Sequence, residues 1–422
     1  MDEQKIPFLK NYNHSDNEAL QSSKQLLQHH PTPIYQGGNQ EDDYVEHTTL
    51  VKRVWVESTK LWHVVGPSII ARISAYTMLV AGQAFAGHLG DLELAAVSIA
   101  CNVIVGFDYG LMFPLQRFLQ CQLKAGVVAW VSVVALVVQI FTSWLFVSVL
   151  KCGVIGIAMS QNLGWWVLVI GLFGYTALGG CPLTWAGFSI EAFSGLWEFV
   201  KLSSASGVMI SLENWYYRIL ILITGNLKNA EIALDALTIC LSINGWEMMI
   251  PFAFFAGTGV RVANELGARN GKGAKFATIV AVTTSLAIGL FFCLLVLIFH
   301  DKLAYIFSTS QPVVEEVKKL SILLATTILF NSVQPVLSGV AVGSGWQSIG
   351  AYINIGCYYL LGLPLGVFMG WKFELGIMGI WAGMIGGTAI QTLILAIITI
   401  RCDWEKEAQK ASMHVKKWAE GI

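Results

Sequence analysis

The chain has 422 residues, of which 55% are hydrophobic and only 13% are charged, with a formal net charge of −1 and a mean hydropathy of +0.62. Only 29 of the 53 charges lie in the 339 residues from Trp62 to Ile400, whereas about a quarter of the residues in a soluble domain are charged. This predicts a polytopic membrane protein and excludes a soluble enzyme, a nucleic-acid-binding protein and a disulfide-stabilised scaffold.

The N-terminal segment, residues 1–49, is rich in Asn, Gln, Asp, Glu, Ser and His and lacks apolar periodicity, a composition typical of disorder. We expect no signal peptide, because no apolar run follows the N-terminus. Residues 50–61 are expected to form a short amphipathic helix at the membrane interface, ahead of the first span. A second polar tail covers residues 403–422.

Between the tails lie ten apolar runs, each near the length of about 20 residues that a helix needs to cross a bilayer. We divide them between a first lobe, residues 50–190, and a second lobe, residues 191–402. The predicted spans are about 62–87, 92–118, 127–149, 154–178, 201–225, 233–258, 275–300, 319–343, 349–370 and 376–400.

Basic residues gather at one side of these spans. Lys52 and Lys60 precede the first span, Arg269 and Lys272 lie between the sixth and seventh, and Arg401 follows the last. Short loops rich in Lys and Arg face the cytosol. Ten alternating spans would therefore place both termini in the cytosol.

The two halves of the chain resemble each other. Residues 105–108 (VGFD) pair with residues 244–247 (NGWE) at an offset of 139, and residues 115–120 (LQRFLQ) pair with residues 333–338 (VQPVLS) at an offset of 218. Ordered matches of this kind are typical of a transporter that arose by internal duplication.

The change in offset indicates that the first half is incomplete. The offset between matching residues rises from 139 to 218, by about 79 residues, within a few positions of the first half. A stretch near residues 252–330 therefore has no counterpart there. That stretch contains one whole span and parts of two others. The first half would then hold four spans and the second six, with two half-spans joined at Met112-Phe113 inside a single run.

Four further motifs resemble those of a known family. They are GGCPLTW at 179–185, LENWYY at 212–217, VRVANELGA at 260–268 and QPVLSGVA at 334–341. Together they resemble plant members of the multidrug and toxic compound extrusion family, over about residues 50–415. The resemblance implies an all-α, two-lobed bundle of twelve spans, of which this chain would have about ten. The family's first-lobe GQAYGA-type motif is absent, in agreement with the gap in the repeat.

Glu213 is the first candidate functional residue. It lies about 12 residues into the predicted span 201–225, and an ionisable group inside a span is a candidate for function because its charge is costly there. We predict that it couples protons or substrate. The alternative is a glutamate held in place by Arg218 or by a structural hydrogen bond. The resemblance implies coupling, since the family's second lobe carries a glutamate in this span.

Glu247 is the second candidate. It lies in the next span, and its repeat counterpart is Asp108, so both halves keep an acid at this position. Retention in both halves fits a packing role as well as a role in transport. The predicted cavity residues surrounding the two acids are Asn214, Tyr216, Tyr217, Asn244 and Tyr358.

Arg261 and Glu265 are four residues apart at the predicted cytosolic end of a helix. This spacing favours a salt bridge, and we interpret the pair as a helix-end or gating contact between the lobes. No cluster of residues suggests a metal site. Gly267–Lys272 is followed by Gly273 and does not match the phosphate-binding loop of ATP-driven pumps.

These features predict secondary active efflux of small organic compounds, cationic or polyphenolic, by proton-coupled antiport. The proton gradient would supply the energy without a cofactor, and the protein would act as a monomer in the vacuolar or plasma membrane. Two alternatives remain: a shortened isoform that does not transport, and a membrane protein that conducts anions passively.

Overall fold

The computed structural model describes residues 49–87, 111–182, 184–185, 187, 189–193, 196–225, 230–307 and 310–420. The predicted N-terminal tail up to residue 48, most of the predicted span 92–118, and Asp108 lie outside the described residues. The residues from Val54 onward belong to one compact unit. All regular structure in the described ranges is helical.

The first predicted lobe contains three long described helices: α3 (Leu50–Gly87), α5 (Ala125–Trp144) and α6 (Gly153–Tyr175). Short π-helical segments extend α5 as η2 (Leu145–Val149) and α6 as η3 (Thr176–Gly180). A helical segment at 111–121 packs with them through Met112 and Leu119. Their shared apolar cluster also contains Met78 and Trp165, both fully buried.

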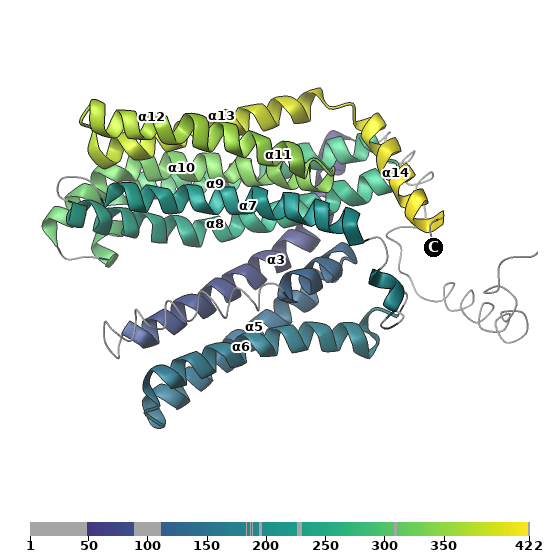
Figure 1. Ribbon diagram of the computed structural model, residues 1–422, viewed down its shortest axis with the longest axis horizontal. Coiled ribbons are helices and arrows are strands. Elements are labelled where there is room, and N and C mark those ends of the chain that lie inside the picture. The colour runs from purple at the N-terminus through teal and green to yellow at the C-terminus, as the bar shows by residue number, and fades with distance from the viewer. Residues whose placement is uncertain are drawn as a thin grey trace, which may run out of the picture. The chain divides into compact units, whose positions relative to one another are not determined.

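The second predicted lobe begins after a short 3₁₀ turn, η4 (Ile190–Phe193). Its helices run side by side in Figure 1. They are α7 (Leu196–Thr224), α8 (Ala230–Gly267), α9 (Gly271–Phe307), α10 (Gln311–Gly343), α11 (Gln347–Asn354), α12 (Leu363–Val367) and α13 (Gly376–Arg401). Two π-helical segments, η5 (Ile355–Gly362) and η6 (Phe368–Lys372), flank α12, and α14 (Trp404–Glu420) ends the described chain.

Eight described helical stretches are long and apolar enough to cross a membrane, and each overlaps one of the predicted spans. The apolar helical character that the sequence predicts is thus confirmed. Helix α7 has 29 residues but is not among the eight, because polar residues in its middle, Glu213 and Asn214 among them, lower its hydropathy. Together with the undescribed part of 92–118, this leaves the total of ten as a prediction.

Two helix boundaries differ from expectation. Residues 50–61 do not form a separate interfacial helix but are the first turns of α3, a single helix of 38 residues. No Gly or Pro separates them from the span, so the helix propagates without a break. Helix α8 likewise continues to Gly267. Arg261 and Glu265 therefore lie in the last turns of α8, beyond the predicted end of the span at residue 258.

Helix α10 forms the core of the second lobe. Two-thirds of its most apolar stretch is buried inside the protein, against half or less in the other seven candidate spans. It packs against α8 at glycines, because a Cβ on Gly339 would lie 2.5 Å from the carbonyl oxygen of Phe255, and one on Gly343 would lie 2.5 Å from that of Gly259. Small residues let membrane helices approach this closely. The approach holds α10 directly beside α8.

The segment from α11 to η6 is helical without a break but alternates between α-helical and π-helical turns. The sequence places Pro364 in the middle of this predicted span, and the eight residues of η5 just before it are π-helical. Proline cannot donate a backbone hydrogen bond to the preceding turn, and a wider π-helical turn absorbs such a defect. Tyr358, which lies within η5, is thereby turned toward α7 and α13.

Candidate functional site

The carboxyl group of Glu213 lies where α7, α10 and η5 meet. Gln334 of α10 donates a hydrogen bond from Nε2 to Glu213 Oε1. The hydroxyl oxygen of Tyr358 in η5 lies 3.3 Å from the same Oε1. Among the described residues no ion pair includes Glu213, and Arg218 is exposed on α7. Neutral hydrogen-bonding groups, rather than Arg218, therefore hold this carboxyl.

A second set of contacts extends from Tyr358 into α13 and α11. The Tyr358 hydroxyl donates to Oε1 of Gln391 in α13. Gln391 Nε2 donates to Oδ1 of Asn354 in α11 at 2.7 Å, and Asn354 Nδ2 donates to the carbonyl oxygen of Met209 in α7 at 3.0 Å. This chain of buried polar groups leads from Glu213 back to its own helix.

Tyr217, one helical turn after Glu213 on α7, makes a further contact that leads through α10 to α8. The Tyr217 hydroxyl donates to Asn331 Oδ1 at 3.1 Å. Asn331 Nδ2 in turn donates to Asn244 Oδ1 at 3.3 Å. Asn331 belongs to α10, so α10 joins Tyr217 to Asn244. Two predicted cavity residues are thus linked through one that the sequence did not single out.

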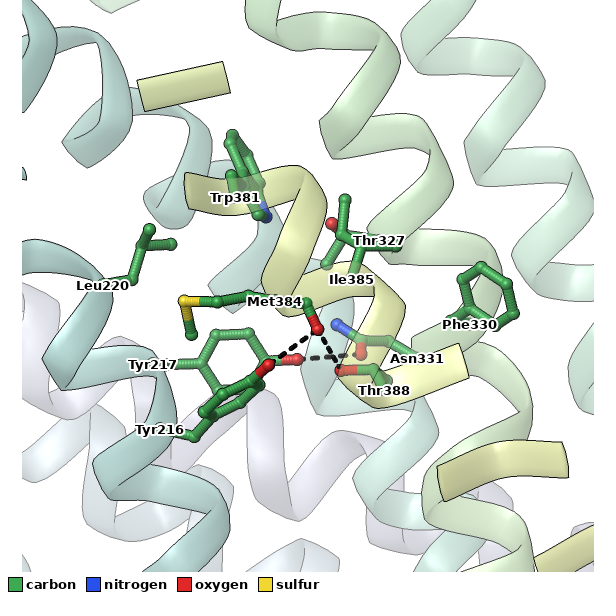
Figure 2. Close-up of a pocket in the computed structure, with 10 residues that line it drawn as sticks. All are labelled: Tyr216, Tyr217, Leu220, Thr327, Phe330, Asn331, Trp381, Met384, Ile385 and Thr388. Carbon is green, nitrogen blue, oxygen red and sulfur yellow. Dashed lines mark hydrogen bonds between the residues drawn. The ribbon is translucent and has the colours of Figure 1, made fainter. Parts of the chain in front are cut away.

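Figure 2 shows a small cavity beside this contact, lined by residues of α7, α10 and α13. It has room for about one water molecule, with a volume of about 10 Å³. An organic substrate does not fit there in this conformation. The lining residues are Tyr216, Tyr217, Leu220, Thr327, Phe330, Asn331, Trp381, Met384, Ile385 and Thr388.

Tyr216 lines this cavity and is also tightly packed. It is 1% exposed, stacks on the Tyr358 ring with centroids 4.3 Å apart, and donates from its hydroxyl to the Met384 carbonyl at 2.8 Å. Asn214 lies on the exposed face of α7, where its amide donates to the Ile210 carbonyl at 3.0 Å.

Glu247 of α8 is buried, with 6% of its surface exposed. Neither of its carboxyl oxygens has a hydrogen-bond partner among the described residues. It lies one helical turn from Asn244 and next to Trp246, whose ring meets that of Tyr76 edge-on at 5.0 Å. An ionised carboxylate without a partner is costly to bury. Among the described residues, Glu247 is the one acid whose carboxyl oxygens are buried without a hydrogen-bond partner.

Arg261 and Glu265 form the predicted salt bridge, with Nη2 and Oε1 2.6 Å apart. A third residue joins them: Glu57 of α3 accepts hydrogen bonds from Arg261 Nε at 2.9 Å and from Nη2 at 3.0 Å. The three side chains are buried, and Asn270 donates to the remaining oxygen of Glu265 at 2.9 Å. Glu57 could not be singled out from the sequence, because it precedes the predicted first span, between Arg53 and Lys60.

The other residues that the sequence analysis missed are neutral. Asn331, Gln334, Asn354 and Gln391 are all buried and all hydrogen-bonded. Each is an amide side chain inside an otherwise apolar helix. Their presence in apolar runs could have indicated these contacts from the sequence, because burying a side-chain amide without a hydrogen-bond partner costs free energy.

Comparisons with known proteins agree with this architecture. A family model described as MatE matches residues 205–368. Protein DETOXIFICATION 27 of Arabidopsis thaliana is 54% identical over 456 aligned positions, which cover 88% of this chain and 94% of that protein. Protein DETOXIFICATION 26 of the same organism is 52% identical over 450 positions and covers 87% of this chain and 92% of its own length.

Two solved structures show the same fold. The crystal structure of the eukaryotic MATE transporter AtDTX14 superposes with a TM-score of 0.80 at 27% identity and covers 86% of this chain and 99% of its own. The Vibrio cholerae MATE transporter VcmN, in its bent form, gives a TM-score of 0.66 at 13% identity, covering 85% of this chain and 99% of its own. The second likeness concerns the fold alone.

The alignment with DETOXIFICATION 27 is longer than the part of this chain that it covers. Its 456 positions include 88% of 422 residues, or about 371 residues of this chain, so about 85 positions are gaps on the side of this chain. With a close relative aligned over nearly its whole length, and with the same helical fold, this chain is not an enzyme but belongs to the multidrug and toxic compound extrusion (MATE) family of membrane transporters.

Proposed function

We propose that this chain exports small organic compounds by proton-coupled antiport, with Glu213 as the group that binds the proton. The observation that carries the proposal is the setting of Glu213, whose carboxyl contacts the neutral side chains of Gln334 and Tyr358. A carboxylate in a salt bridge keeps its charge. A carboxyl held by neutral groups in an apolar helix bundle is able to gain and lose a proton during the cycle.

Antiport needs two conformations that bind proton and substrate differently. A ligand shifts such an equilibrium only by its differential affinity for the two states. Protonation of Glu213 would remove a negative charge from the interior of the second lobe and so weaken binding of a cationic or phenolic substrate there. The lobes, residues 50–190 and 191–402, would then rock to expose the cavity on alternate sides.

Glu247 is proposed as a second coupling group. It is buried and has no partner among the described residues, and its neighbour Asn244 connects through Asn331 to Tyr217, one turn from Glu213. Structural glutamates are held by partners. An acid maintained without one is better explained by a function in transport.

The proposal has further parts. The basic loops favour a cytosolic location for both termini. We propose the proton gradient as the energy source and a monomer in the vacuolar or plasma membrane as the active form. Arg261 and Glu265, with Glu57, would close the lobes on the cytosolic side.

The test is uptake of a fluorescent organic cation and of a labelled flavonoid into proteoliposomes that carry a pH gradient. The variants are Glu213→Gln and, as a matched control, Glu315→Gln, which changes an exposed acid of α10. We expect gradient-driven transport by the unaltered chain and by the control, and none by Glu213→Gln. Gradient-dependent transport that persists in Glu213→Gln would contradict the role of Glu213.

A second candidate function is that of a shortened isoform without transport activity. It is favoured by the roughly 85 alignment positions that this chain lacks relative to DETOXIFICATION 27. A first lobe short of two spans would not enclose a cavity. The same proteoliposomes test it: a stably inserted protein that transports nothing, and that lowers the activity of a co-reconstituted full-length relative, would favour this function.

A further inference from the structure

A chain of hydrogen bonds begins and ends on α7, one helical turn apart. It begins at the carbonyl oxygen of Met209, continues through Asn354, Gln391 and Tyr358, and reaches Glu213. Asn354, Gln391 and Tyr358 are at most 2% exposed. Solvent does not compete for their donors and acceptors, so each of these groups depends on its neighbours in the chain.

The donor-to-acceptor direction of these hydrogen bonds is fixed at the Met209 end. A backbone carbonyl only accepts hydrogen bonds, so Asn354 must present its NH₂ group to Met209 and its Oδ1 to Gln391. A side-chain amide has one donor end and one acceptor end. Gln391 must therefore present Nε2 to Asn354 and Oε1 to Tyr358, and the single hydroxyl hydrogen of Tyr358 is committed to Gln391.

This leaves a lone pair of the Tyr358 oxygen facing Glu213 Oε1 at 3.3 Å, a separation that is long for a bond donated by a hydroxyl group. A protonated Glu213 can donate to that lone pair, whereas an ionised one would face it oxygen to oxygen. Gln334 does not discriminate in the same way, because its Nε2 donates to a carboxyl oxygen in either form.

We infer that Asn354, Gln391 and Tyr358 are positioning residues that select the protonated form of Glu213 in this conformation. The inference deepens the proposed function and rests on it. When Glu213 loses its proton, the Tyr358 hydroxyl turns from Gln391 to the carboxylate. Its hydrogen bond to α13 is then broken, so the charge of Glu213 is linked to the contact between η5 and α13.

The experiment measures the pH dependence of gradient-driven uptake, together with infrared titration of the buried carboxyl groups, in the full chain. Gln391→Met removes the acceptor and releases the Tyr358 hydroxyl to donate to ionised Glu213. We expect the pH at which uptake is half-maximal to fall by about one unit, which is a tenfold rise in the proton concentration required. A change of this size corresponds to the gain or loss of one hydrogen bond. In a Tyr358→Phe background, Gln391→Met is expected to cause no further shift.

The matched control is Gln139→Met, because Gln139 of α5 is also fully buried and donates to a carbonyl oxygen, that of Met78, at 2.7 Å. It is expected to leave the midpoint unchanged. Gln391→Asn, which shortens the side chain and keeps its polarity, provides a second variant if Gln391→Met does not fold. A shift of the midpoint to lower pH that needs the Tyr358 hydroxyl would support the inference.

A lower rate with an unmoved midpoint would overturn the inference, as would an equal shift in the Tyr358→Phe background. Glu213→Gln distinguishes this failure from that of the proposed function. If the pH response survives Glu213→Gln, the proposed function itself is wrong. If Glu213→Gln abolishes the pH response while the Gln391 variants leave the midpoint unchanged, only the inferred role of Asn354, Gln391 and Tyr358 is wrong.

Discussion

The guanidinium of Arg261 in α8 and the carboxylate of Glu57 in α3 form a two-pronged ion pair, with Nε–Oε1 and Nη2–Oε2 distances of 2.9 and 3.0 Å. Parallel bonds of this kind combine energy with a fixed geometry. The two residues are 204 positions apart in the chain and belong to different predicted lobes. Since Glu265 shares the same guanidinium, one buried cation holds two carboxylates at the junction of α3 and α8.

Replacing Arg261 is expected to destabilise the protein strongly. Arg261→Gln would leave Glu57 and Glu265 buried without their cation, and breaking a buried pair costs about 3–5 kcal/mol. Thermal unfolding in detergent measures the effect. The control is Lys406→Gln, which breaks an exposed pair with Asp403 at 3.4 Å and is expected to cost less than about 1 kcal/mol. Equal Tm values for the two variants would refute the buried triad.

Glu247→Leu separates function from packing at Glu247. Replacing an unpaired buried carboxyl by an apolar side chain of similar volume is expected to leave the Tm unchanged or to raise it. Gradient-driven transport is expected to be lost. A variant that transports normally would show that Glu247 is not a coupling group, and one that unfolds would show that the carboxyl has a structural role.

Gly339→Ala tests the close approach of α8 and α10. The added methyl group would lie 2.5 Å from the Phe255 carbonyl oxygen, and overpacking of this kind costs about 1–3 kcal/mol. The matched control is Gly174→Ala in α6, where a Cβ meets no atom within 4 Å and alanine favours the helix. We expect a lower Tm for the first variant and an unchanged or higher one for the second.

Helix α14 is expected to contribute to stability through Trp404. This residue is 6% exposed and packs against Val262, Leu266 and Val340. Trp404→Ala is expected to cost about 3–5 kcal/mol, as large-to-small changes in a core do. Met413→Ala on the same helix, where the side chain is 62% exposed, is the control and is expected to be close to neutral.

Cysteine labelling tests the proposed sidedness. Cys152 is exposed between η2 and α6, in a loop that the proposed topology puts opposite the basic loops, and an impermeant maleimide added outside cells is expected to label it. Cys402 follows α13, at the end of that helix which the proposed topology puts on the cytosolic side. Burial, aided by the nearby Glu407 and Asp403, raises the pKa of its thiol to about 11, so labelling should stay slow even in permeabilised cells. Rapid labelling of Cys402 from outside would reverse the topology.

The sequence by itself determined the class of protein and the location of most helices. A charge-poor middle and runs of about 20 apolar residues are local properties, and eight of the described helices lie where those runs predicted them. Glu213 and Glu247 could be singled out in the same way, because the cost of an ionisable group in a span depends on its own surroundings in the chain.

The tertiary structure alone decided which groups meet. Nothing in the sequence pairs Glu57 with Arg261, or Glu213 with Gln334, which is 121 residues away. Such contacts depend on how each helix is rotated and how closely it approaches its neighbours, as at Gly339. Apolar faces pack in many registers of similar energy, whereas a buried polar group must find a partner. The hydrogen bonds of the amide side chains therefore appear only once the helices are assembled.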